Sequence, residues 1–168
     1  MTGLVTKVRS PAQIAAVTAL VWEFFDFLRG RYPEMQREID DYIAKQNVAA
    51  DLANFADVFL PPKGECLAVE REGEIVGMVM LRQRADGDAE MNRMYVRESA
   101  RGLGLGRMLC SALIEEARSL GYGAVWLGAL YRHVEALPLY ESMGFKRARD
   151  PAAHNADDDR VIQMKLVF

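Results

Sequence analysis

The glycine-rich stretch at residues 90–106 limits what this chain can be more than any other part of it. A strand-like run ends at Val96, a short polar link follows, and three glycines open a helix. Arg101, Gly104 and Gly106 give the spacing R-x-x-G-x-G. Because glycine has no Cβ, phosphate oxygens can approach the backbone N–H groups of such a loop, and the positive end of the helix adds to the attraction. The stretch therefore predicts a site for a phosphorylated cofactor.

Two common phosphate-binding motifs do not fit these residues. A P-loop needs Gly-Lys followed by Ser or Thr, and no such sequence closes this loop. The glycines at 102, 104 and 106 give no register of the dinucleotide motif G-x-G-x-x-G. They also come in mid-chain, after three strand-like segments, and not at a first βα turn. The P-loop and dinucleotide interpretations are therefore set aside.

Length and composition predict one globular domain, residues 1–168. Apolar residues make up 51% and charged residues 27% of the chain, and the net charge of −3 gives no reason to expect nucleic acid as a partner. No segment approaches the roughly 20 apolar residues of a membrane span, and the N-terminus lacks the apolar run of a signal peptide. We therefore expect a cytoplasmic protein without a membrane partner.

Cysteine and histidine give little sign of chemistry of their own. Cys66 lies in a strand-like run and Cys110 in an apolar helix, so both are expected to be buried thiols, and no Cys-His motif suggests a nucleophile. His133 and His154 have no metal-binding spacing, so no metal is expected. His133 is a minor candidate for a contact with the cofactor or the acceptor.

Apolar periodicity predicts helices that alternate with a mainly antiparallel sheet, which is an α+β or mixed α/β class. Tight turns join three successive strands near the middle of the chain into a meander. Helices are expected at 11–30, 34–47, within 48–59, and at 105–120 and 134–143. Strands are expected at 3–9, 66–70, 75–84, 89–96, 124–130, from 145 onward, and at 161–168.

Residues 89–145 resemble the core of the Gcn5-related N-acetyltransferase (GNAT) superfamily. The resemblance rests on the strand AEMNRMYV, the R-x-x-G-x-G loop, the strand AVWLGAL, and the sequence L-Y-x-x-x-G-F about 35 residues after the loop. It implies a central, mostly antiparallel twisted sheet of six to seven strands flanked by about four helices. It also implies acetyl transfer from acetyl-CoA, used as a co-substrate, to an amine.

The resemblance implies how the cofactor would be bound. Met94, Tyr95 and Val96 would run along the pantetheine arm, which hydrogen-bonds to their main chain like an extra strand. A main-chain N–H near Met94 or Tyr95, where the superfamily strand bulges, would stabilise the oxyanion. The pyrophosphate would be bound by backbone N–H groups of the loop, with charge added by an arginine. The loop residues concerned are Arg101, Gly102, Leu103, Gly104, Leu105, Gly106 and Arg107.

Two residues are candidates for proton transfer. An alkyl ammonium has a pKa near 10.4 and must lose a proton before it attacks; Glu90 lies where some superfamily members carry a glutamate base, acting directly or through water. The alternative is that Glu90 forms an ion pair with an arginine such as Arg93. Tyr140 takes the place of the superfamily's general acid, and its alternative role is packing in the core. Pro138 is tolerated in this helix only if it lies in the first turn.

Three residues are candidates for binding the acceptor. Asn92 lies two residues from Glu90 and two from Met94, so regular alternation places all three side chains on one face of the strand. Trp22 and Phe25 belong to an aromatic group on the first helix, which either packs in the core or lines an acceptor pocket.

The sequence therefore predicts an acetyl-CoA-dependent N-acetyltransferase that acts on a primary amine of a small molecule or a peptide. A non-catalytic acyl-CoA-binding sensor on the same fold is the alternative, because a fold does not fix a function. A nucleotide-binding module is a weaker one. The acceptor's identity is not given by the sequence, and a homodimer, frequent in the superfamily, is left open.

Overall fold

Seven strands form one sheet in the computed structural model, which describes residues 4–131, 135–153 and 158–168. The order of the strands is β1-β2-β3-β4-β5-β7-β6. Only β4 and β5 pair in parallel, and the other neighbouring pairs are antiparallel. The mostly antiparallel sheet and the central meander are confirmed. The strands are β1 (Leu4–Lys7), β2 (Glu65–Arg71), β3 (Glu74–Gln83), β4 (Ala89–Val96), β5 (Ala124–Leu130), β6 (Lys146–Arg147) and β7 (Val161–Val167).

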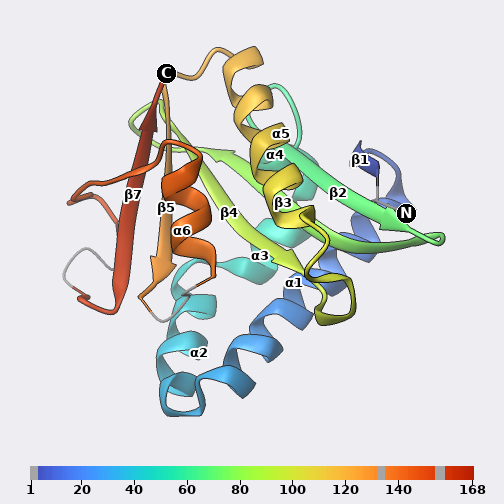
Figure 1. Cartoon of the computed structure of the whole chain (residues 1–168), viewed down its shortest axis with the longest axis horizontal. Coiled ribbons are helices and arrows are strands. Elements are labelled where there is room, and N and C mark those ends of the chain that lie inside the picture. Colours follow the sequence, from blue (N-terminus) through green and yellow to red (C-terminus); the bar gives the residue numbers. More distant parts are fainter. Residues whose placement is uncertain (1–3, 132–134, 154–157) are drawn as a thin grey trace.

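Helices cover both faces of this sheet (Figure 1). One hydrophobic core contains residues of the first four helices, and the other contains residues of the last two. The described residues form six α-helices, whereas the resemblance implied about four and the periodicity predicted five; the segment 48–59 is divided at Asn54 into two short ones. They are α1 (Pro11–Arg31), α2 (Gln36–Lys45), α3 (Val48–Ala53), α4 (Phe55–Phe59), α5 (Leu105–Ser119) and α6 (Ala136–Ser142), with 3-10 turns at Pro33–Met35 and Glu98–Ala100.

The start of α1 is fixed by its sequence. Ser10 Oγ accepts from the backbone N–H of Gln13, and Gln13 Oε1 accepts in return from the N–H of Ser10, with Pro11 as the first helical residue. By length and composition alone, α1 could cross a membrane, which the sequence analysis did not anticipate. In the structure, its residues Val17 and Val21 are buried in the core beneath the sheet, as in a core helix of a globular domain.

The strands β3 and β4 are buried on both faces. Along β3, Met78 and Met80 belong to the core on the α1 side, whereas Val79 and Leu81 belong to the core on the α5 side. This alternation is the ordinary period of two of a strand. A strand packed on both sides is a rigid support for groups that must keep fixed positions.

Two irregularities interrupt this regular sheet at β4. Met78 lies opposite Tyr95 and Met80 opposite Asn92, so one residue of β3 faces two residues of β4, which is a β-bulge. Within the bulge, Arg93 has a φ of 53°, in the left-handed region. On its other edge, β4 pairs with β5 only at two positions, Ala89 with Val125 and Glu90 with Trp126. Beyond Glu90 the two strands separate (Figure 1).

We predict that Arg9→Ala lowers the free energy of unfolding by about 2 kcal/mol, because it leaves a buried carboxylate without its cation, although solvent reaches the half-exposed Arg9 and weakens the pair. Glu65 is 1% exposed and accepts from Arg9 Nη1 and Nη2 at 2.7 and 2.8 Å. This ion pair ties the entry to α1 to the strand β2. Urea unfolding of the variant measures the effect.

The matched control is Lys7→Ala, which removes an exposed pair with Glu116 and should change stability by less than about 0.5 kcal/mol. Equal effects of the two substitutions would contradict a special role for the buried pair.

Candidate active site

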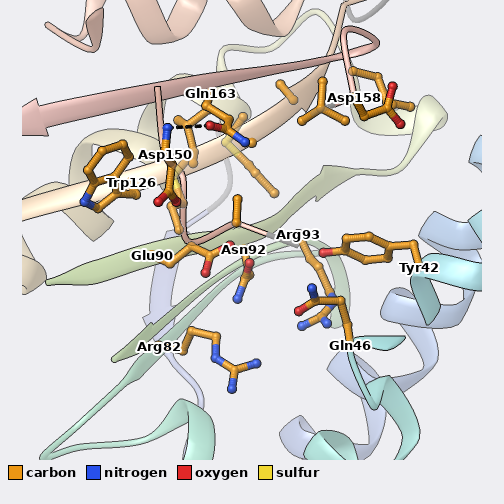
Figure 2. Close-up of a pocket in the computed structure, with 18 of the residues that line it drawn as sticks. Tyr42, Gln46, Arg82, Glu90, Asn92, Arg93, Trp126, Asp150, Asp158 and Gln163 are labelled. Carbon is orange, nitrogen blue, oxygen red and sulfur yellow. Dashed lines mark hydrogen bonds between the residues drawn. The ribbon is translucent and has the colours of Figure 1, made fainter. Parts of the chain in front are cut away.

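A cavity of about 780 Å³ lies where β4 and β5 separate. Its walls come from α1, α2, β4, β5, α6 and the chain around Arg82 and Asp150 (Figure 2). Among the predicted site residues, it is lined by Glu90, Asn92, Met94, Phe25 and Tyr140. The sheet therefore brings together side chains from both ends of the sequence.

Glu90 lies on the α1 side of β4. Its neighbours Ala89 and Met91 belong to the core on the α5 side, so the alternation of the strand turns Glu90 the other way. Within the described part of the chain, its carboxylate has no ion pair and no hydrogen bond. Glu90 therefore does not form the ion pair with Arg93 that the sequence analysis gave as its alternative role. Burial raises the pKa of Glu90, and the charges of Arg82, Arg84 and Arg93 oppose that rise.

The bulge changes the faces of the residues that follow it. Met94 packs against the core on the α5 side, and an added Cβ on Gly106 would meet Met94 Cε at 3.8 Å. The expectation that Met94 shares a face with Glu90 and Asn92 is therefore wrong, because one extra residue in a strand reverses the alternation. Asn92 is 8% exposed and lines the cavity.

Tyr140 occupies the other side of the opening. Pro138 is the third residue of α6, so its missing N–H is one that a helix start leaves without an intrahelical partner. The Tyr140 ring packs edge-on against Phe145, with centroids 6.0 Å apart. Its hydroxyl has no hydrogen-bond partner among the residues described. Burial strongly raises the pKa of Tyr140, which keeps the phenol protonated. The ring is thus part of the core, and the residue also lines the cavity.

The loop before α5 presents unpaired N–H groups. Gly102 and Gly104 have φ values of 80° and 76°, which favour glycine, and an added Cβ on either would meet nothing within 4 Å. The first bond of the helix runs from the N–H of Met108 to the carbonyl of Gly104, at 3.1 Å. Within the described chain, none of the N–H groups from residue 102 to 107 donates to a protein acceptor. A second cavity, of about 290 Å³, lies against this loop and is bounded by Val96, Gly106 and Leu139, among others.

The two arginines of the loop are held by other protein groups. Arg101 Nε donates to the carbonyl of Val96 at 2.9 Å, and its guanidinium lies over the ring of Phe27 at 4.4 Å. Arg107 Nη2 donates to Ser142 Oγ at 3.0 Å. Both arginines border the second cavity, so their charge is present there.

The side chains of three other predicted cofactor residues are exposed to solvent or buried in a core. Leu103 is 42% exposed and does not border the second cavity. The Tyr95 ring is buried on the α1 side, against Phe24 and Phe27 at 5.7 and 5.9 Å. The Leu105 side chain is buried in the core on the α5 side.

The aromatic residues of α1 divide between the cavity and the core. Phe25 lines the cavity, and so does Phe24, which the sequence analysis did not select. Trp22 lies outside the cavity walls and packs on Phe25, with ring centroids 6.1 Å apart. Successive side chains on a helix point in directions about 100° apart. The sequence alone could not show which of these aromatic side chains faces the cavity and which faces the core.

Sequence reasoning missed several polar residues of the cavity. Arg93 was considered only as a partner for Glu90, yet it lines the cavity together with Tyr42 of α2. Arg84 donates to Asp150 at 2.7 Å and lies 4.7 Å from the ring of Trp126. The signal that could have identified Arg93 was its position, because it is a charged residue at the centre of a strand with buried neighbours.

The remaining polar candidates of the sequence analysis are the two histidines and the two cysteines. His133 and His154 lie outside the described residues. In residues 4–131, 135–153 and 158–168, no group of three His, Cys, Asp or Glu side chains is placed to hold a metal ion. Cys66 and Cys110 are buried, as expected, and burial raises the pKa of both thiols, that of Cys110 to about 11.

We predict that Glu90→Gln makes the folded protein more stable than the wild type at neutral pH. The folded-state pKa of Glu90 lies above its ordinary value of 4.5. Between these two pKa values the folded state binds more protons than the unfolded state, so the wild type loses stability as pH rises from the lower value to the higher one. The difference between the two proteins should shrink as pH falls towards about 4.5. Thermal unfolding of both proteins across this range measures it. A less stable variant at neutral pH would indicate that Glu90 is a structural ion-pair partner.

Comparisons with known proteins agree with this geometry. A model of the acetyltransferase (GNAT) family matches residues 17–145. An uncharacterised N-acetyltransferase of Schizosaccharomyces pombe is 32% identical over 158 residues, which are 93% of this chain and 96% of the relative. An N-acetylaspartate synthetase of Danio rerio is 36% identical over 99 residues, which are 58% of this chain but only 35% of the relative.

Solved structures support the same fold. The PaiA N-acetyltransferase of Thermoplasma acidophilum, solved in complex with coenzyme A, superimposes with a TM-score of 0.71 at 15% identity and covers the whole of both chains. The loop, the divided sheet and these matches together show that the chain belongs to the GNAT family of acetyltransferases and is an N-acetyltransferase.

Proposed function

We propose that this enzyme transfers the acetyl group of acetyl-CoA to a primary amine, with Glu90 as the general base and Tyr140 as the general acid. The observation that carries the proposal is that both residues line one cavity at the point where β4 separates from β5. In the described part of the chain, neither side chain has a hydrogen-bond partner that would keep it from a substrate. A base and an acid are thus available at one opening in the sheet.

The residues of the loop fit a pyrophosphate. Six successive N–H groups, from residue 102 to 107, have no acceptor among the described residues, and the start of a helix favours an anion. The edge of β4 from Asn92 to Val96 has no pairing with β5, so its main chain is available to a pantetheine arm. The Thermoplasma neighbour is named as a coenzyme A complex, which supports this assignment.

Each catalytic step has a residue assigned to it. Glu90 takes the proton of the attacking amine, directly or through a water, as the nitrogen bonds to the thioester carbonyl carbon. A main-chain N–H near Met94 or Tyr95, next to the bulge, donates to the oxyanion. When the carbon–sulfur bond breaks, Tyr140 gives its proton to the departing thiolate. The products are an amide and free coenzyme A.

The acceptor is expected to be a small amine or a peptide. The cavity volume of about 780 Å³ lies in the range of small-molecule sites. The relative named for N-acetylaspartate synthesis suggests an amino acid, but this chain spans about a third of that protein. The cytoplasmic location and the homodimer stay predictions.

We predict that Glu90→Gln and Tyr140→Phe each lower kcat/KM about 100-fold, because each removes one proton-transfer group. Coenzyme A binding should be unchanged, since neither side chain lies at the pyrophosphate loop. The defect of Glu90→Gln should shrink at high pH, where the free amine becomes abundant without a base. Thiol release with a panel of amines measures turnover, and calorimetry measures coenzyme A binding.

Tyr122→Phe and Glu116→Gln are the matched controls, because both residues lie outside the two cavities. Unchanged turnover in both active-site variants would contradict the assigned roles. A wild-type protein that binds coenzyme A but acetylates no amine would favour the acyl-CoA sensor.

We predict that Gly106→Ala weakens coenzyme A binding at least about 10-fold while the fold is kept. An added Cβ would make only ordinary contacts with Leu139 and Met94, both at 3.8 Å, but it would project towards the second cavity. Within a helix, alanine is favoured over glycine by about 1 kcal/mol, so the free energy of unfolding should not fall. Calorimetry and urea unfolding test the two parts separately. Unchanged coenzyme A affinity would place the cofactor elsewhere.

A further inference from the structure

Arg93 is a buried charge that has no ion pair and no hydrogen bond with the described residues. Its side chain is 8% exposed, and its Nε and Nη1 atoms are buried without any hydrogen bond. An unpaired buried guanidinium is costly, and burial lowers the pKa of Arg93. Its backbone, at φ 53°, adds a conformation that non-glycine residues seldom adopt. Unfavourable features such as a strained backbone or an unpaired buried charge are found mostly at functional sites.

The described groups around Arg93 supply no acceptor for its Nε and Nη1 atoms. The guanidinium lies 5.7 Å from the centroid of the Phe59 ring, and a ring face does not accept from the N–H groups in the guanidinium plane as a carboxylate would. Asp51, an acid near Arg93, already accepts from Arg82 Nη1 at 2.7 Å. Figure 2 shows Tyr42 and Gln46 extending towards Arg93 from the other side of the cavity.

The other charges of the described cavity wall are paired within the protein. Asp86 and Asp150 accept from Arg84, and Glu38 and Asp158 are paired with Arg160. With Arg82 bound to Asp51, the wall is left with one acid and one base that have no ion-pair partner in the described chain, Glu90 and Arg93. An occupant that complements them carries a positive and a negative group.

On the basis of the proposed function, we propose that the acceptor is a free amino acid, whose amino group lies at Glu90 and whose carboxylate binds the guanidinium of Arg93. Glu90 and Arg93 are three residues apart on β4 and turn to the same side because of the bulge. The charge of each already stabilises the charged form of the other. The amide of Asn92, between them, is in position to hydrogen-bond the same carboxylate.

The test compares amino acids with their own carboxamides as acceptors. A carboxamide keeps the amine and the side chain and removes only the negative charge. Its amino group is the weaker base, so more of it is unprotonated at neutral pH, and basicity alone would favour the amide. We expect wild-type kcat/KM to favour the acid of the best pair about 100-fold. Equal rates for acid and amide would overturn the inference.

Arg93→Met should abolish this preference, because kcat/KM on the acid should fall about 100-fold more than kcat/KM on the carboxamide. The melting temperature should stay equal or rise, because the variant removes an unpaired buried charge. Arg93→Lys keeps the charge without the planar donors, and should keep a preference of about 10-fold. Arg82→Lys is the matched control: it alters the neighbouring arginine of the same wall but keeps a cation beside Asp51, so Asp51 is not released to pair with Arg93, and it should keep the full preference. A loss of preference in Arg82→Lys equal to that in Arg93→Lys would overturn a site at Arg93.

Failure of the inference and failure of the proposed function give different results. If acetyl transfer occurs equally to acids and amides, only the carboxylate site is wrong. If no amine is acetylated, the proposed function fails, and thermal stabilisation by the amino acids, with coenzyme A present, then tests the site. Stabilisation of the wild type but not of Arg93→Met supports the site, and stabilisation of neither protein overturns it.

Discussion

The separation of β4 from β5 is the constraint on which the rest of the site depends. Parallel pairing stops after two residue pairs, so on that edge the main chain of β4 beyond Glu90 pairs with no other strand of the described residues. Buried main-chain groups need partners, and the opening is therefore a place for a ligand that can supply them. The same separation exposes Glu90 from one face and Tyr140 from the other to a single cavity.

The bulge in β4 determines which side chains enter that cavity. It places Arg93 on the α1 side with Asn92 and returns Met94 to the α5 side. Around this point, the cavity wall pairs most of its charges internally, as Arg84 does with Asp150, and paired charges of this kind fix the wall without binding a substrate. Recognition is left to the few groups that the fold does not neutralise.

The sequence predicted the parts of the structure that depend on local chemistry. The helix expected at 11–30 begins at Pro11 with Ser10 as its N-cap, and glycines 102 and 104 of the predicted phosphate loop adopt left-handed conformations, which glycine favours. The resemblance implied a bulge near Met94 or Tyr95, but the residues themselves do not indicate one, because a one-residue shift at Arg93 is set by pairing with β3 and leaves the pattern of apolar residues almost unchanged. Regular alternation therefore placed Met94 on the wrong face. The roles of Glu90 and Tyr140 came from the resemblance, and they stay predictions.

One helix serves both ends of the site. Within a single turn of α1, Phe24 and Phe25 line the large cavity, while Phe27 lies under the Arg101 guanidinium of the glycine loop. The ring of Tyr95 touches both Phe24 and Phe27. Packed side chains of this kind transmit displacement, because a dense core has little free volume in which to absorb it. A shift of α1 caused by one substrate would therefore alter the affinity for the other, and thermodynamic linkage makes that dependence mutual.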